Sequence, residues 1–166
     1  MTSPQKAKGN GWERMVAKHL SAIFDTNFTR VPTSGAMTGG QNAHILEKLT
    51  DTQKLLLEGD LIPPDHMYKM KIECKAHKSF SFSSIYTSNK QLDDWINQAV
   101  SDDKVWFLIF KINNQGKFVC FGKDVFDACD GLGGRNFTIY KQNYYIASMN
   151  DFFEEYKSNL LQICSM

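Results

Sequence analysis

The chain has 166 residues, of which 42% are hydrophobic and 13% aromatic, and its formal net charge is +1. This composition can bury one hydrophobic core without disulfides, and no long polar linker divides the chain, so we expect a single domain over residues 1–166. The four cysteines lack the Cys-x-x-Cys spacing of a zinc site, which argues against a zinc knuckle and against a secreted disulfide framework.

The N-terminal part predicts a helix followed by a strand. The first six residues lack the apolar core of a targeting segment, and no apolar run approaches membrane-spanning length, so we expect a soluble, intracellular protein. A helix is predicted from about residue 10 to 23, with Glu13 at the margin of an apolar stripe. A strand is predicted at residues 27–31, and Arg30 and Ser34 flank the turn that follows it, where a phosphate could bind. The stripe consists of Trp12, Met15, Val16, His19, Leu20 and Ile23.

The most informative feature is a pair of acidic residues on two predicted strands. The segment Tyr68–Lys75 alternates apolar and charged side chains, so a strand there places Glu73 and Lys75 on one face. If the intervening Pro63–His66 turns the chain back, Asp60 faces Glu73 at roughly 5 Å between Cβ atoms. Two carboxylates that close repel each other, and a shared divalent cation is the simplest resolution.

Carboxylate oxygens suit Mg²⁺, with Mn²⁺ as a substitute. Such an ion activates a water and neutralises charge on a phosphate, and Lys75 could orient or help deprotonate that water, so the predicted reaction is phosphodiester hydrolysis. Two alternatives stay open at this point. A Glu-x-Lys pair also occurs on solvated strand faces, and Asp65 is a rival for Asp60, although we interpret it as a turn residue after two prolines.

The rest of the chain predicts further helices and strands. Residues 79–83 suit a half-buried strand or an ordered loop, and Ser88–Gln91 is a capping signal for an amphipathic helix with Leu92, Trp95, Ile96 and Ala99 on its apolar face. Residues 104–112 and 117–121 are predicted to form a central hairpin. Residues 137–140 and 144–147 are predicted as edge strands, followed by one helix that Asn150 and Asp151 cap and that carries Phe152, Phe153, Tyr156, Leu160 and Leu161 on an apolar face.

Taken in order, the motifs resemble those of the PD-(D/E)xK nuclease superfamily, and within it most resemble the Holliday junction resolvases of the archaeal and phage type. Two departures are an insert at about 36–58 and a glycine at position 59, where the family has a proline before the aspartate. Residues 113–166 carry no family motif. The shared signals, within about residues 6–112, are Glu13 in the first helix, the turn Arg30-Val31-Pro32-Thr33-Ser34-Gly35, Gly59-Asp60, the strand Ile72-Glu73-Cys74-Lys75, and Lys90-Gln91 at the start of a helix.

The resemblance implies a restriction-endonuclease-like α/β fold, in which helices flank a mixed central sheet. It also implies a Mg²⁺-dependent DNA endonuclease that leaves 5′-phosphate and 3′-hydroxyl ends. Asp60, Glu73 and the carbonyl of Cys74 would hold the metal, Glu13 would complete the site, Lys75 would assist the water, and Arg30, Ser34 and Gln91 would contact DNA.

As a resolvase, the protein would cut branched DNA such as a four-way junction, as a homodimer with two active sites. Its place would be the cytoplasm of a bacterium, an archaeon or a phage-infected cell, and the insert would be a loop that closes over DNA or a helical decoration. Three alternatives stay open. The chain could be a restriction-like, repair or nicking endonuclease of the same superfamily, a DNA-binding module that does not cleave, or a structural or protein-interaction domain.

Overall fold

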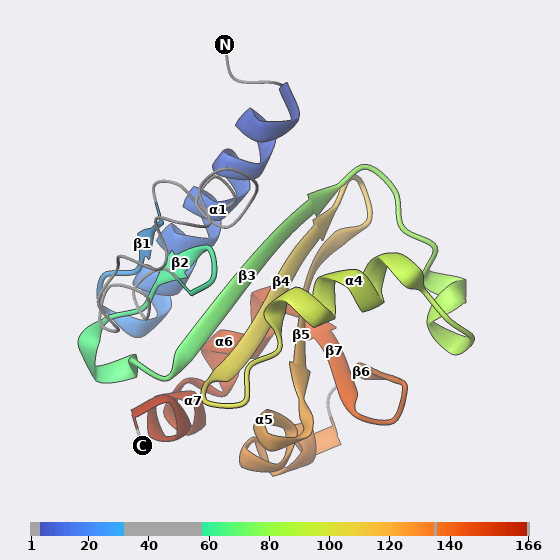
Figure 1. Ribbon diagram of the computed structural model, residues 1–166. Coiled ribbons are helices and arrows are strands. Elements are labelled where there is room, and N and C mark those ends of the chain that lie inside the picture. Colours follow the sequence, from blue (N-terminus) through green and yellow to red (C-terminus); the bar gives the residue numbers. More distant parts are fainter. Residues whose placement is uncertain (1–3, 32–57, 135, 166) are drawn as a thin grey trace.

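The computed structural model describes residues 4–31, 58–134 and 136–165. Within these residues one seven-stranded sheet has the order β1-β2-β3-β4-β5-β7-β6, with helices on both of its faces (Figure 1). Only β3 and β4 pair in parallel, and the other described neighbours are antiparallel. The strands are β1 Thr29–Arg30, β2 Leu61–Ile62, β3 Met70–His77, β4 Val105–Ile112, β5 Gly116–Gly122, β6 Phe137–Tyr140 and β7 Tyr144–Ser148. The predicted mixed sheet flanked by helices is confirmed.

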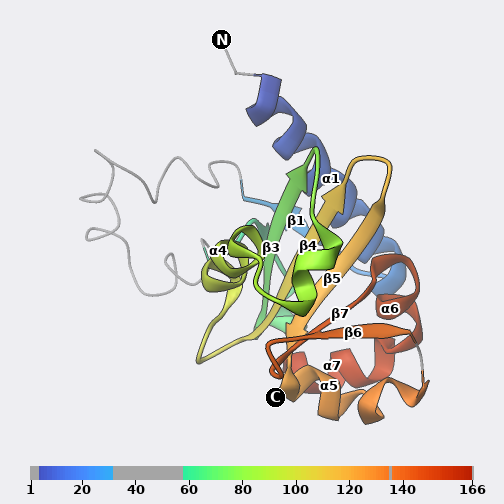
Figure 2. The same cartoon turned by 90° about the vertical axis from the view of Figure 1, so that its right-hand side faces the viewer.

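The helices divide between the two faces of the sheet. Helix α4 covers one face, and α1 and α6 cover the other (Figure 2). The alternation of side chains along β4 explains this division, because Leu108 and Phe110 belong to the apolar cluster under α4, while Phe107 and Ile109 belong to the cluster under α1 and α6. The helices are α1 Pro4–Phe24, α4 Lys90–Ala99, α5 Lys123–Ala128, α6 Met149–Glu155 and α7 Lys157–Ser165, with short 3₁₀ turns η2 Asp65–Met67, η3 Phe82–Tyr86 and η4 Asp130–Gly134.

The N-terminal elements differ from the predictions at their boundaries. Helix α1 begins at Pro4, well before the predicted start. Met15, placed in the apolar stripe, is 39% exposed, because the packed face of the helix is formed by Trp12, Val16 and Leu20. The predicted strand over residues 27–31 is reduced to the two residues of β1, which pair with the equally short β2.

Strand β3 has the predicted alternation but begins two residues later. Met70, Ile72 and Cys74 are buried, whereas Lys71, Glu73 and Lys75 are half-buried on the other face. Tyr68, which the alternation placed in the strand, is 55% exposed because it caps the 3₁₀ turn η2 instead. Asp65 begins that turn and is exposed, in agreement with its interpretation as a turn residue.

The segment between β3 and α4 is a loop that runs into η3 and not a strand. Phe80 is nevertheless buried, as expected for a core residue.

The cap of α4 is Asn89 and not Ser88, because the Asn89 carboxamide oxygen accepts the Leu92 N–H at 2.9 Å. The Asn89 N–H in turn donates to the hydroxyl of Tyr140 at 3.0 Å, which ties the start of α4 to the end of β6.

The C-terminal third contains the predicted strands in a different arrangement. The hairpin of β4 and β5 is confirmed. Strand β7 lies between β5 and β6 and is therefore not an edge strand. The single predicted helix is two helices, α6 and α7, separated at Tyr156, whose ψ of 19° departs from helical geometry. Helix α5 was not predicted.

In the part of the chain described here, no helix has both the length and the apolar character needed to cross a membrane.

Candidate active site

The two acids singled out in the sequence face each other across the pairing of β2 and β3. Leu61 pairs with Ile72, and Asp60 and Glu73 directly adjoin this pair. The Asp60 N–H donates to the Ile72 carbonyl at 2.8 Å, which fixes the backbone at this point. The register agrees with the hairpin expected from the sequence, although a 3₁₀ turn is included in the connection.

Gly59 explains why a proline cannot precede the aspartate in this chain. Its φ is +85°, in the left-handed region, whereas proline is held near −65°. A Cβ at this position would also lie 2.5 Å from the Ile72 carbonyl oxygen. The departure from the family pattern therefore reflects a sharp turn of the backbone that delivers Asp60 to β3.

The Asp60 carboxylate is held at the edge of β3 where β2 has ended. Its Oδ2 accepts the backbone N–H of Cys74 at 2.7 Å. Because the N–H and C=O of one strand residue point toward the same neighbour, the Cys74 carbonyl faces this edge as well. Burial raises the pKa of the Cys74 thiol well above its ordinary value, so the sulfur is protonated and is a poor metal ligand.

Burial and charge repulsion act together on Asp60. Loss of solvent and the neighbouring Glu73 carboxylate raise the pKa of Asp60 to about 6, and Glu13 contributes in the same direction. The Cys74 N–H and Lys75 lower the pKa but do not cancel this effect. A carboxylate whose ionisation is made costly by burial and by a second nearby carboxylate is a place where a cation is favourable.

Lys75 lies on the same face of β3 as Glu73. Its Nζ donates to Glu73 Oε1 at 2.6 Å, and the two side chains are only 23% and 13% exposed. The same Nζ donates to Gln98 Oε1 at 2.6 Å. The ammonium is thus held between β3 and the last turn of α4.

Glu13 and Arg30 form an ion pair between α1 and β1. The Arg30 Nε donates to Glu13 Oε2, and a terminal nitrogen of Arg30 donates to the Asn10 carboxamide oxygen at 2.8 Å. Both charged side chains are largely buried, with 16% and 11% exposed. Arg30, expected from the sequence to contact a phosphate, is engaged with α1 in this structure.

The other expected contacts to DNA are placed as follows. Ser34 and most of the insert lie outside the described residues. Gln91 lies in the first turn of α4 and is half-buried. Gln98 lies seven residues further along α4, on the same face and two turns away, and it is this glutamine that reaches Lys75.

Two residues at this site were not singled out by sequence reasoning, Asn10 and Gln98. The seven-residue spacing between Gln91 and Gln98 is a local signal that could have drawn attention to the second glutamine. Asn10 carries no such signal, because its role depends on Arg30, twenty residues away.

The donors fit a hard divalent cation with few protein ligands. Among residues 4–31, 58–134 and 136–165, no three or more His, Cys, Asp or Glu side chains form a group that could hold a metal ion. Asp60 and Glu73 nevertheless provide two facing carboxylates whose repulsion a cation would relieve. Mg²⁺ is usually bound by only one or two carboxylates together with waters and substrate phosphates, so this pair suits it.

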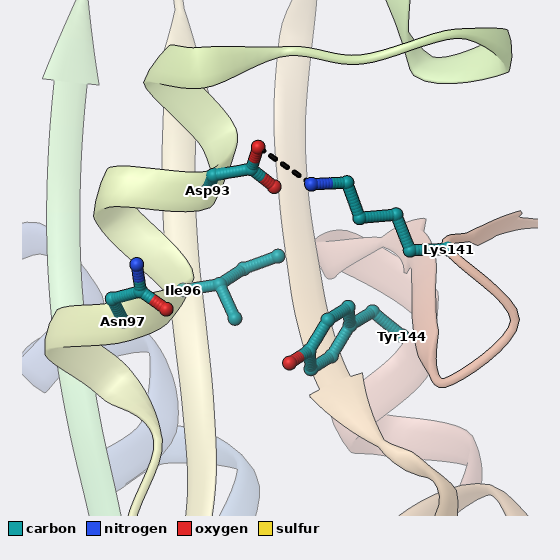
Figure 3. Close-up of a pocket in the computed structure, with 5 residues that line it drawn as sticks. All are labelled: Asp93, Ile96, Asn97, Lys141 and Tyr144. Carbon is teal, nitrogen blue, oxygen red and sulfur yellow. Dashed lines mark hydrogen bonds and ion pairs between the residues drawn. The ribbon is translucent and has the colours of Figure 1, made fainter.

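Away from these carboxylates, a hollow of about 260 Å³ lies between α4 and the turn that joins β6 to β7 (Figure 3). Two of its lining residues form an ion pair, in which Lys141 Nζ donates to Asp93 Oδ2 at 2.7 Å. The Tyr140 hydroxyl donates to Asp93 Oδ1, also at 2.7 Å. Its charged groups thus satisfy each other, and its volume is below the range of about 300–1,000 Å³ that is usual for ligand pockets. The carboxylates of Asp60, just before β2, and of Glu73 on β3 are the stronger candidate site.

Comparison with known proteins identifies one matching family. A family model described as phage putative PDDEXK endonuclease matches residues 4–162. The matched range includes the C-terminal part, in which no motif was recognised from the sequence. No curated protein and no solved structure matches the chain.

Proposed function

Because the chain belongs to the phage PDDEXK endonuclease family, and is therefore a nuclease of the PD-(D/E)xK superfamily, we propose that it is a Mg²⁺-dependent endodeoxyribonuclease whose active site is Asp60, Glu73 and Lys75. The observation that carries this proposal is the attachment of Asp60 to β3, where its N–H donates to the Ile72 carbonyl and its carboxylate accepts the Cys74 N–H, next to Glu73 and Lys75. We further propose that the preferred substrate is branched DNA such as a four-way junction, which the order of the sequence motifs favours.

The residues that would hold the metal are Asp60, Glu73 and the Cys74 carbonyl. Glu13 would complete the site, and its effect on the pKa of Asp60 supports this placement. Mn²⁺ would substitute for Mg²⁺ with these oxygen donors. When bound, the ion supplies Lewis acidity at the scissile phosphate and lowers the pKa of a coordinated water.

The protein's own groups would position the nucleophile and the phosphate. Lys75 would orient the attacking water and place positive charge next to the phosphorus, where negative charge develops. The water oxygen would bond to phosphorus while the bond from phosphorus to the 3′ oxygen breaks, leaving 5′-phosphate and 3′-hydroxyl ends. Gln91 and, outside the described residues, Ser34 would contact the DNA backbone. Arg30 would act near the phosphate only after loosening its bond to Glu13.

Cutting a four-way junction requires paired incisions, so we propose a homodimer with two active sites. The test is to incubate a labelled four-way junction and a linear duplex of matched sequence with the protein, in Mg²⁺ or in EDTA. We expect paired nicks near the branch in Mg²⁺ and none in EDTA. Equal cutting of both substrates would instead identify a restriction-like, repair or nicking endonuclease.

Matched variants separate the chemistry from general effects of charge. Asp60→Asn and Lys75→Met should abolish cleavage while the protein still binds the junction. Asp127→Asn and Lys123→Met make the same chemical changes in an exposed ion pair on α5 and should leave cleavage unchanged. Full activity of the purified Asp60→Asn protein would refute the assignment, and binding without cleavage by the unaltered protein in Mg²⁺ or Mn²⁺ would identify a DNA-binding module.

A further inference from the structure

The last turn of α4 is joined to the polar face of β3 by two lysines. Lys71 Nζ donates to the carbonyl oxygens of Gln98 and Val100, at 3.2 Å and 3.1 Å. Lys75, four residues further along the same face, donates to the Gln98 side-chain oxygen at 2.6 Å. Gln98 is therefore held at its backbone by one lysine and presents its carboxamide to the other.

The helix end accounts for the first contact. The last carbonyls of an α-helix lack intrahelical partners and carry partial negative charge, so a cation placed there is stabilising. Helix α4 packs on this face of the sheet through Leu92, Trp95, Ile96 and Ala99, which are buried. Packing sets the position of the helix axis, and Lys71 fixes its carbonyl end with respect to β3.

The second contact determines where the Lys75 ammonium points. A lysine ammonium has three N–H donors on a flexible four-carbon stem, so a single acceptor leaves it free to rotate. Two of these donors are accepted by Glu73 Oε1 on the strand and by Gln98 Oε1 on the helix, each at 2.6 Å. The direction of the third N–H is then fixed by the geometry of the other two.

We propose that Gln98 is a positioning residue for Lys75, and that Lys71 holds Gln98 in place for this purpose. The proposal rests on the proposed function, in which the third N–H of Lys75 meets the attacking water or the phosphate. Without Gln98, the ammonium would turn toward Glu73 alone and lie in the productive direction for less of the time. The expected loss is in kcat and not in DNA affinity, because Gln98 acts on the lysine and not on the substrate.

The experiment compares two substitutions of the same length. Gln98→Met removes the acceptor, and we expect kcat for cleavage to fall about tenfold while KM for DNA changes less than about twofold. Gln98→Glu keeps an acceptor oxygen, and we expect its kcat to stay within about threefold of the unaltered protein. Lys71→Met keeps both Lys75 and Gln98 but loosens the helix end, and it should give an intermediate loss of kcat.

Asn97→Leu is the matched control, because Asn97 is exposed on the same turn and faces the hollow on the other side of α4 (Figure 3). It should cleave as the unaltered protein does. Melting temperatures of the Gln98 variants and of Asn97→Leu should agree closely with that of the unaltered protein, because both positions are exposed.

The outcomes separate this inference from the proposed function. Full kcat in Gln98→Met, with Asp60→Asn inactive, would overturn the positioning role and leave the nuclease assignment standing. An equal loss of kcat in Gln98→Met and Gln98→Glu would also overturn it, since the acceptor oxygen would then be irrelevant. If the unaltered protein fails to cut any DNA, the proposed function itself falls, and the role of Gln98 with it.

Discussion

Asp60→Asn should make the metal-free protein more stable at neutral and alkaline pH, although it removes a proposed catalytic group. Burial and the facing Glu73 raise the pKa of Asp60 from 3.8 to about 6. A raised carboxyl pKa means that the folded state holds the proton more tightly than the unfolded chain does. The stabilisation that this tighter proton binding gives the folded protein is therefore fully present below about pH 4, and it is lost as pH rises through about 6.

The size of the effect follows from the shift. A difference of about 2 units corresponds to about 3 kcal/mol, which is the upper limit of what ionising Asp60 costs the folded state. Asparagine keeps an oxygen that can accept the Cys74 N–H but never ionises, so Asp60→Asn should gain about 1–3 kcal/mol at pH 8. For a chain of this length this corresponds to a rise in melting temperature of roughly 2–10 °C.

Urea unfolding in EDTA at pH 8 and at pH 5 would measure this directly. At pH 5 the unaltered protein recovers about half of the cost, because Asp60 is then mostly protonated in the folded state, so the advantage of the variant should shrink by about 1.4 kcal/mol. Mg²⁺ should stabilise the unaltered protein more than the variant. A variant that is less stable than the parent at pH 8, or an advantage that is the same at both pH values, would refute the reasoning.

Three further predictions concern the elements that support the site. Gly59→Ala should lower the free energy of unfolding by more than about 1 kcal/mol, measured in urea, because φ is +85° and the added Cβ would meet the Ile72 carbonyl; a neutral effect would contradict the turn described here. Arg30→Met should lower the free energy of unfolding at pH 8 by about 1.5–3 kcal/mol because it removes a largely buried, charged hydrogen bond to Glu13, and the double variant with Glu13→Gln should recover much of this loss. Phe107→Ala should cost about 3–5 kcal/mol in the same assay, since Phe107 is fully buried under α6, and a smaller loss would mean that this core collapses around the gap.

The acidic pair could be predicted because its signals are local. The period of two in β3 assigns each side chain to a face, and the two prolines before Asp65 indicate where the chain turns back. Together they predict the register in which Leu61 pairs with Ile72, next to Asp60 and Glu73. The central hairpin of β4 and β5 was predictable for the same reason, as its turn is short and its strands are strongly apolar.

What the sequence did not reveal depends on residues far apart in the chain. The pairing of Arg30 with Glu13 joins a strand to a helix, and the contact of Lys75 with Gln98 spans 23 residues. The backbone N–H of Asn89, the cap of α4, donates to the hydroxyl of Tyr140, 51 residues away. None of these contacts has a periodic signature, because each is decided by how the helices dock on the sheet.

The shortness of β2 is itself a requirement of the site. A longer β2 would pair with the edge of β3 through its backbone, and the Cys74 N–H would donate to a backbone carbonyl of that strand. The left-handed turn at Gly59 ends the pairing there, and the Asp60 carboxylate takes that N–H instead. Negative charge is thus placed at a sheet edge, next to a second carboxylate and within reach of an ammonium held by α4. The same backbone turn that excludes proline at position 59 therefore generates the charge concentration from which the proposed chemistry follows.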